Sequence, residues 1–193
     1  IENHIPLPLE DLVYDHEVME SLNDDQDHLD VIITAFPRGI LNAYIRAIKE
    51  VGLEPYAIEL ESQSIVRACI PQLHSPEARM VVDIGRMRTS FVIFARGAIF
   101  HTSTIEVGGS MLEQHLIKQL NVTAQEATRI KINTGLDKTE AKGEIFAALA
   151  PVISSIGDEL VRAISYYHTH TTHAHGATPR IERIFLSGGD ANL

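Results

Sequence analysis

Residues 81–94 constrain the fold most, because they read as two apolar strands joined by a glycine turn, with the carboxylate of Asp83 at the bend. Another apolar strand, 181–186, runs into the glycine pair Gly188 and Gly189. Glycine turns at strand ends expose amide hydrogens with little side-chain bulk, which is what a phosphate group needs. The presence of both turns, in this order along the chain, predicts a nucleotide-binding site between them.

Composition and charge narrow the class of protein. The chain has 193 residues, 45% hydrophobic and 22% charged, which is typical of one large or two small globular domains. The formal net charge of −10 argues against a nucleic-acid or anionic-lipid surface. No apolar run approaches the ~20 residues that cross a bilayer, so we expect no direct membrane insertion. Cys69 is the only cysteine and cannot form an internal disulfide, which favours a cytoplasmic location.

Residues 1–74 predict a small α+β subdomain that ends in a connecting helix. The expected strands cover residues 12–19, 30–35 and 56–60. The β-branched run in the second of them favours a central position in a sheet. An amphipathic helix is expected to begin at Pro37 and to end at Gly52, where glycine enters the left-handed conformation without strain. A further helix passes through Ile65, and the acidic residues 23–27 fit a hairpin tip.

Residues 75–193 predict a larger lobe of α/β type. The expected strands, of which the first three form an antiparallel meander, cover residues 79–83, 91–94, 99–105 and 181–186. Helices are expected after the glycines at 108–109 and after a capping box at 123–126. A long helix is expected over about 144–167 despite Pro151.

Several residues near these turns could hold a phosphate or its metal ion. The candidates are Asp83, Gly85, Thr89, Ser90, Gly108 and Gly109. The glycines offer amide hydrogens, and the last two precede a helix N-terminus with its partial positive charge. The two hydroxyl groups can donate hydrogen bonds, and the carboxylate could hold Mg²⁺ through water. Taken singly, each glycine turn also fits an ordinary loop.

Four histidines cluster in a polar segment before the last strand. They are His168, His170, His173 and His175. Neutral imidazole is a good ligand for zinc or nickel, so a metal-binding module is one interpretation. A polar surface loop is the alternative that we favour, because no cysteine lies nearby and the spacing is not that of a rigid helical site.

The order of these features resembles the actin-like ATPase superfamily, and within it most closely the PilM family of type IV pilus assembly proteins, relatives of the cell-division protein FtsA. The likeness covers nearly the whole chain. It rests on residues 1–15, which resemble the start of the family's inserted subdomain, and on residues 51–61, which resemble its end. It rests also on the final strand and glycine turn at 180–193. It implies an actin-like, ribonuclease-H-like lobe carrying a small inserted α+β subdomain.

The resemblance also assigns roles to individual residues. Asp83, Gly85, Thr89 and Ser90 fall on the family's second phosphate loop, Gly108 and Gly109 on a turn near the nucleotide, Lys131 on the helix that flanks the adenosine, and Gly188 and Gly189 on the turn that cradles it. Arg86 and Arg88 depart from the small residues usual there, and Thr128 stands where an acidic residue often meets the ribose. These departures predict weakened or lost nucleotide affinity. The family's first phosphate loop is expected before residue 1.

The function implied by the resemblance is a non-catalytic scaffold that binds ATP and Mg²⁺. Its expected location is cytoplasmic, peripheral to the inner membrane, and its expected partner is the cytoplasmic tail of a PilN-like inner-membrane protein. Self-association into a homo-oligomer is left open. An active ATPase or phosphotransferase of the same superfamily is the main alternative, although the sequence shows no candidate for the base or water-positioning residue that it needs.

Overall fold

The computed structural model describes residues 7–18, 31–71, 77–170 and 180–193, and its chain divides into two compact units. Unit 1 covers Ile1–Glu61 and unit 2 covers Ser62–Leu193. The expected hairpin tip at 23–27 lies outside the described residues, as do His173 and His175. No helix in the described part of the chain is both long enough and apolar enough to span a membrane.

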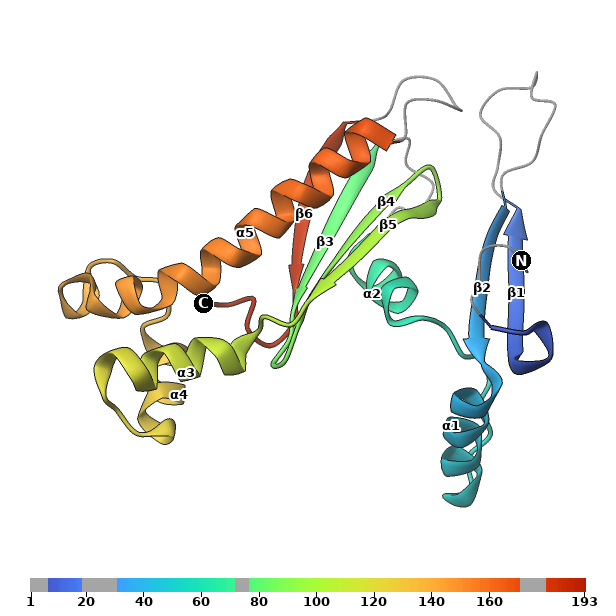
Figure 1. Cartoon of the computed structure of the whole chain (residues 1–193), viewed down its shortest axis with the longest axis horizontal. Coiled ribbons are helices and arrows are strands. Elements are labelled where there is room, and N and C mark those ends of the chain that lie inside the picture. Colours follow the sequence, from blue (N-terminus) through green and yellow to red (C-terminus); the bar gives the residue numbers. More distant parts are fainter. Residues whose placement is uncertain (1–6, 19–30, 72–76, 171–179) are drawn as a thin grey trace. The chain divides into compact units, whose positions relative to one another are not determined.

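Unit 1 contains a two-stranded sheet and a helix (Figure 1). A short 3-10 helix, η1 (Leu9–Asp11), leads into β1 (Leu12–Val18), which pairs antiparallel with β2 (Val31–Pro37). α1 (Arg38–Glu50) follows at once, with Pro37 at its N-cap, and Gly52 beyond its end has φ +80°. Both ends of the helix are therefore where the sequence predicts them.

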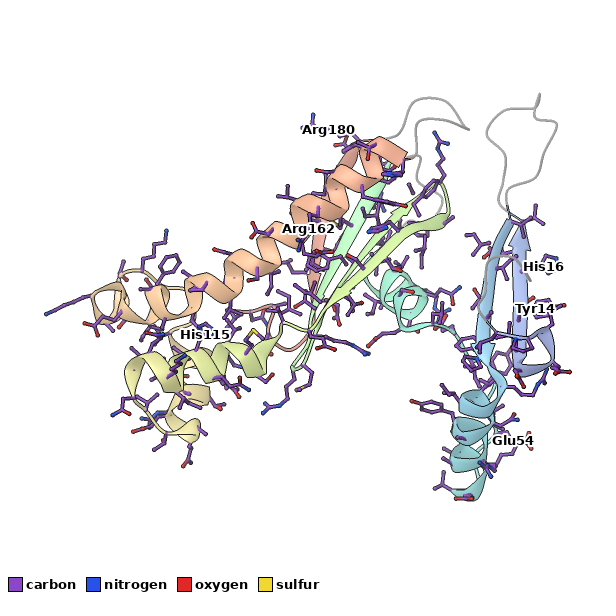
Figure 2. All side chains as sticks on the ribbon, in the orientation of Figure 1. Tyr14, His16, Glu54, His115, Arg162 and Arg180 are labelled. Atoms are coloured by element: carbon purple, nitrogen blue, oxygen red, sulfur yellow. The ribbon has the colours of Figure 1, made fainter. Side chains whose placement is uncertain are left out.

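One face of this sheet is apolar and exposed. The register places Tyr14, His16 and Val18 of β1 on the same face as Val31 and Ile33 of β2. Their side chains are exposed, and Tyr14 and His16 are labelled where they project from β1 in Figure 2. We call these five residues the β1–β2 face.

Two strand predictions in this part of the chain are wrong. Within the described residues β2 pairs with β1 alone, so it is not a central strand. Residues 53–60 form no strand, and the side chain of Tyr56 is fully exposed. A strand is stable only beside a hydrogen-bonding neighbour, and an apolar run cannot supply that neighbour by itself.

Unit 2 is built on a four-stranded sheet with the order β5-β4-β3-β6. The strands are β3 (Ala78–Ile84), β4 (Thr89–Ala95), β5 (Ala98–Ile105) and β6 (Ile181–Ser187). The first three form the predicted antiparallel meander, and β6 returns parallel to β3. The carboxyl ends of β3 and β6 therefore lie next to each other at one edge of the sheet.

Helices cover both faces of this sheet. α5 (Glu144–His170) packs on one face, where Met80, Val82 and Phe91 meet its Ile156 and Tyr167. α2 (Glu61–Cys69) covers the other face, where Val66 and Ile70 meet β3 and β4. α2 therefore belongs to unit 2, which begins at Ser62. The sequence predicts the boundary between the two domains after residue 74. Burial on both faces explains why the middle of β3, residues 80–82, is continuously apolar.

A helical layer adjoins the sheet. α3 (Gly109–Leu120), α4 (Ala124–Asn133) and the first half of α5 pack around Leu112, Leu116 and Leu149, with η2 (Glu140–Gly143) leading into α5. Figure 1 shows α3 and α4 beside each other beyond the ends of the strands. α4 begins with the predicted capping box, and α5 continues through Pro151 as far as His170.

Candidate functional site

Three glycine turns meet at the carboxyl ends of β3 and β6. The Gly85 turn follows β3, the Gly188 turn follows β6, and Gly108 caps α3. Backbone hydrogen bonds join them: the amide of Asp190 donates to the carbonyl of Ile84 at 3.2 Å, and the amide of Gly109 to that of Gly85 at 3.0 Å. The structure thus brings together turns that lie about a hundred residues apart in the sequence.

The close approach of the turns explains why glycine stands at their contacts. Gly188 has φ +94°, and a methyl group built on it would overlap the backbone of Ile84. A methyl group on Gly108 would lie 2.8 Å from both the Arg86 carbonyl oxygen and the Arg88 amide nitrogen. Neither position has room for a side chain. Gly189 differs, since a methyl group there would meet no atom within 4 Å.

Many of the expected phosphate donors are engaged within the protein. The amide of Gly85 donates to the Arg88 carbonyl at 2.9 Å, and the Gly109 amide is engaged by Gly85. The hydroxyl of Thr89 donates to the Val107 carbonyl at 2.7 Å, and the Ser90 hydroxyl lies 3.2 Å from that of Thr104. These groups hold the turns and strands together. Asp83, at the end of β3, is half-buried opposite Ser90 and Ser187.

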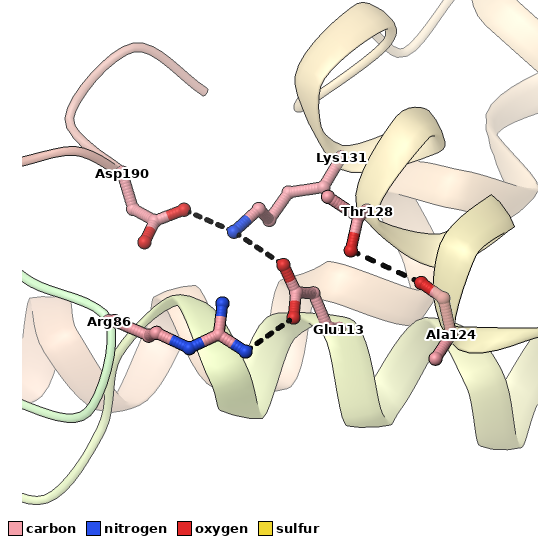
Figure 3. Close-up of polar contacts among 6 residues, drawn as sticks. All are labelled: Arg86, Glu113, Ala124, Thr128, Lys131 and Asp190. Atoms are coloured by element: carbon pink, nitrogen blue, oxygen red, sulfur yellow. Dashed lines mark hydrogen bonds and ion pairs between the residues drawn. The ribbon is translucent and has the colours of Figure 1, made fainter.

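A network of charged side chains crosses the same site (Figure 3). The ammonium nitrogen of Lys131, on α4, lies 2.5 Å from Oδ1 of Asp190 and 3.0 Å from Oε1 of Glu113 on α3. The other carboxylate oxygen of Glu113 lies 3.6 Å from the exposed guanidinium of Arg86. The side chains of Lys131, Glu113 and Asp190 are only 8%, 11% and 10% exposed, so their charges act on one another with little screening.

The network shifts the titration of two of its members. Burial alone would raise the pKa of Glu113, but the hydrogen bond and charge of Lys131, with the charge of Arg86, outweigh it and lower that pKa. Burial alone would lower the pKa of Lys131, but its hydrogen bonds to Asp190 and Glu113 outweigh it and raise that pKa. Both groups are therefore charged at neutral pH.

Sequence reasoning missed Glu113 and Asp190. Asp190 follows the Gly188-Gly189 pair directly, and a carboxylate beside a turn expected to hold an anion was a signal that could have been used. Glu113 gave no such signal, because it lies in the sequence among the apolar positions of α3. Thr128, where an acidic residue was expected, donates its hydroxyl to the Ala124 carbonyl of its own helix at 3.1 Å (Figure 3).

The histidines do not form a metal site in the described part of the chain. His168 and His170 lie in the last turn of α5, not in the predicted loop. The ring of His170 stacks on Tyr166 with centroids 4.0 Å apart, and Tyr166 also contacts His101 of β5. Among the residues described, no group of three or more potential ligands is placed to hold a metal ion.

Solved structures show which class of protein this fold defines. The chain is similar to MreB5 of Spiroplasma citri bound to AMPPNP, with a TM-score of 0.57, 20% identity, and coverage of 67% of this chain and 48% of that one. It is also similar to the PilM-PilN type IV pilus biogenesis complex, with a TM-score of 0.72, 20% identity, and coverage of 98% and 53%. The fold is therefore actin-like, of α/β type, as the sequence predicts.

The family follows from the sequence comparison. The model of the type IV pilus assembly protein PilM family matches residues 1–193, and the chain belongs to this family. A curated relative, the cell division protein FtsA of Neisseria meningitidis serogroup B, is 29% identical over 136 residues, which are 69% of this chain and 31% of FtsA. FtsA of Pseudomonas aeruginosa is 28% identical over 142 residues, 72% and 32% of the two chains. The chain thus spans about a third of the length of these relatives.

Proposed function

We propose that this chain is part of a cytoplasmic, non-catalytic actin-like scaffold of type IV pilus assembly, which binds ATP and docks the cytoplasmic tail of an inner-membrane partner. Membership of the PilM family supports the pilus role. The convergence of three glycine turns at the ends of β3 and β6 is the observation that carries the nucleotide role. Similar actin-like structures were solved with AMPPNP and with ADP, which also favours a nucleotide.

The residues around the turns fit a nucleotide in part. Gly189 borders open space, Arg86 is exposed and cationic, and Asp83 is a half-buried carboxylate that suits water-mediated contact with Mg²⁺. The carboxylates of Glu113 and Asp190 oppose an anion, however, since they already neutralise Lys131. We therefore assign the site a weak affinity for ATP, and we assign Lys131 and the Gly188-Gly189 turn to its adenosine side.

We assign partner docking to unit 1. Among structures similar to this chain is a complex of PilM with PilN, so a PilN-like tail is the proposed occupant. The β1–β2 face offers it four large apolar side chains, each between 43% and 50% exposed. Contiguous apolar surface of this kind is typical of protein interaction sites.

Calorimetric titration of the full-length protein tests both roles separately. We expect heat from ATP with Mg²⁺ and, independently, from a synthetic peptide of the partner's cytoplasmic tail. Replacing Ile33→Asp on the β1–β2 face should abolish peptide binding and leave ATP binding unchanged. The matched control is Ile132→Asp, at an exposed position of α4 in unit 2, and it should bind the peptide like the parent protein. Absence of both heats from the parent protein would refute the proposal.

The non-catalytic assignment has its own test. An active ATPase of this superfamily needs a residue that positions a water or nucleophile for phosphoryl transfer, and we give no described residue that role. We expect no ATP turnover above background. Turnover that disappears in Asp83→Ala would favour the enzymatic alternative instead.

A further inference from the structure

The carboxylate of Asp190 lies where the elements expected to contact a nucleotide come together. It packs against Gly109 so closely that a methyl group built on that glycine would overlap it. It is paired with Lys131, and it follows Gly189 directly in the chain. Asp190 as a whole is only 9% exposed. A buried anion from the protein itself therefore stands between the start of α3, α4 and the Gly188-Gly189 turn.

The groups that would attract an anionic ligand here are already engaged. Lys131 is shared between Asp190 and Glu113, and Glu113 also pairs with Arg86. The amide of Gly85 donates to the Arg88 carbonyl within its own turn, and the amide of Gly109 donates to the Gly85 carbonyl. A phosphate that approaches Lys131 must displace a carboxylate of the same sign, or lie beside it with the repulsion uncompensated.

We propose that Asp190 is a specificity-determining residue of this site, an internal anion that lies against Gly109 at the start of α3 and repels the phosphate groups of a nucleotide whose adenosine lies beside Lys131. The inference rests on the proposed nucleotide-binding function and refines it. The site accepts the uncharged adenosine moiety, and Asp190 opposes the charged part of the ligand. Asp190 thereby reduces the affinity for nucleoside di- and triphosphates while leaving that for nucleosides unchanged.

Titration calorimetry with two ligands, ATP and adenosine, tests this role in the full-length protein. Asp190→Asn keeps the size of the side chain and an acceptor for Lys131 but removes the charge. It should bind ATP about tenfold more tightly than the parent protein or better, a change that corresponds to about 1.4 kcal/mol, and it should bind adenosine with unchanged affinity. The charge-matched control is Asp158→Asn, on the exposed surface of α5, which should leave both affinities as they are.

The outcomes separate this inference from the function on which it rests. If Asp190→Asn and the parent protein bind ATP equally well, the repulsion by Asp190 is refuted while nucleotide binding stands. If neither ligand binds to any variant, both ideas are refuted. A thermal unfolding curve accompanies each variant, and if Asp190→Asn does not fold, Asp190→Ser replaces it. The parent protein alone provides a further test, because adenosine should bind to it at least as tightly as ATP, and a clear preference for ATP would overturn the proposal.

Discussion

At the scale of single residues, two neighbouring glycines have different reasons to be glycine. Gly188 has a left-handed backbone and no room for a Cβ beside Ile84, whereas Gly189 has neither restriction. The first position is therefore required by the fold of unit 2. The second position is not required by the fold, and a side chain there would extend into open space.

Paired alanine substitutions check this difference. Gly188→Ala should lower the free energy of unfolding by about 3 kcal/mol or more, because backbone strain adds to an overlap that only movement of β3 or β6 can relieve. Gly189→Ala should change it by less than about 1 kcal/mol. Chemical denaturation of the two variants and the parent protein measures both values. Equal losses would mean that the two turns do not approach each other as described.

The charge network makes a prediction about pH. The pKa of Glu113 is lower in the folded protein than its ordinary value, so its ionisation stabilises the fold above that ordinary value, and the contribution is lost as pH falls through the lowered pKa. Glu113→Gln should be less stable than the parent protein at neutral pH but should lose less stability on acidification. The exposed Glu140→Gln serves as control. Denaturant unfolding between about pH 7 and pH 3 measures the effect, and parallel curves for Glu113→Gln and the parent protein would contradict it.

At the scale of elements, α4 positions Lys131 and owes its start to a local motif. Thr123 accepts a hydrogen bond from the Glu126 amide, and the Glu126 carboxylate accepts one in return from the Thr123 amide at 3.0 Å. Thr123→Ala should destabilise the protein by about 1 kcal/mol, because it leaves helix amides without their acceptor. Ser154→Ala, at an exposed position within α5, should have almost no effect. Thermal unfolding of both variants gives the comparison, and equal midpoints would exclude a stabilising cap.

Elements that depend on local sequence could be predicted, and those that depend on distant partners could not. The capping box of α4, the stop at Gly52 and the β3-β4-β5 meander all follow from residues close together in the chain. The expected strand at 56–60 failed because pairing needs a neighbour that the run itself cannot specify. The ion pair between Lys131 and Asp190 joins residues far apart in sequence, so only the folded chain reveals that a carboxylate lies against Gly109.

The same limit applies to the candidate site. The glycine turns were found from the sequence because a glycine pair after an apolar strand is a local signal. The contacts between the turns could not be predicted, because the Gly109 amide reaches the Gly85 carbonyl, and the Asp190 amide the Ile84 carbonyl, only in the folded chain. The pattern thus located the turns correctly, while their contacts with one another are a property of the folded chain.

At the scale of the whole molecule, the hydrophobic core is divided unequally between the two units. Among the residues that the structure describes, all three clusters of buried apolar side chains lie within unit 2. In the described part of unit 1, the buried apolar side chains are those of Leu12 and Leu41. Since burial of apolar surface is the main favourable term in folding, the two units should differ strongly in their independent stability.

Separate expression of the units tests this expectation. Residues 62–193 should unfold in one cooperative transition, because their clusters join both faces of the sheet to α2 and α5 and link α3, α4 and α5. Residues 1–61 should show no cooperative transition, because so small a core cannot offset the conformational entropy of about 60 residues. Circular dichroism during urea titration, with amide hydrogen exchange of each fragment, measures the difference. A cooperative transition in the short fragment, or rapid exchange throughout the long one, would show that the stabilising contacts lie elsewhere than in these clusters.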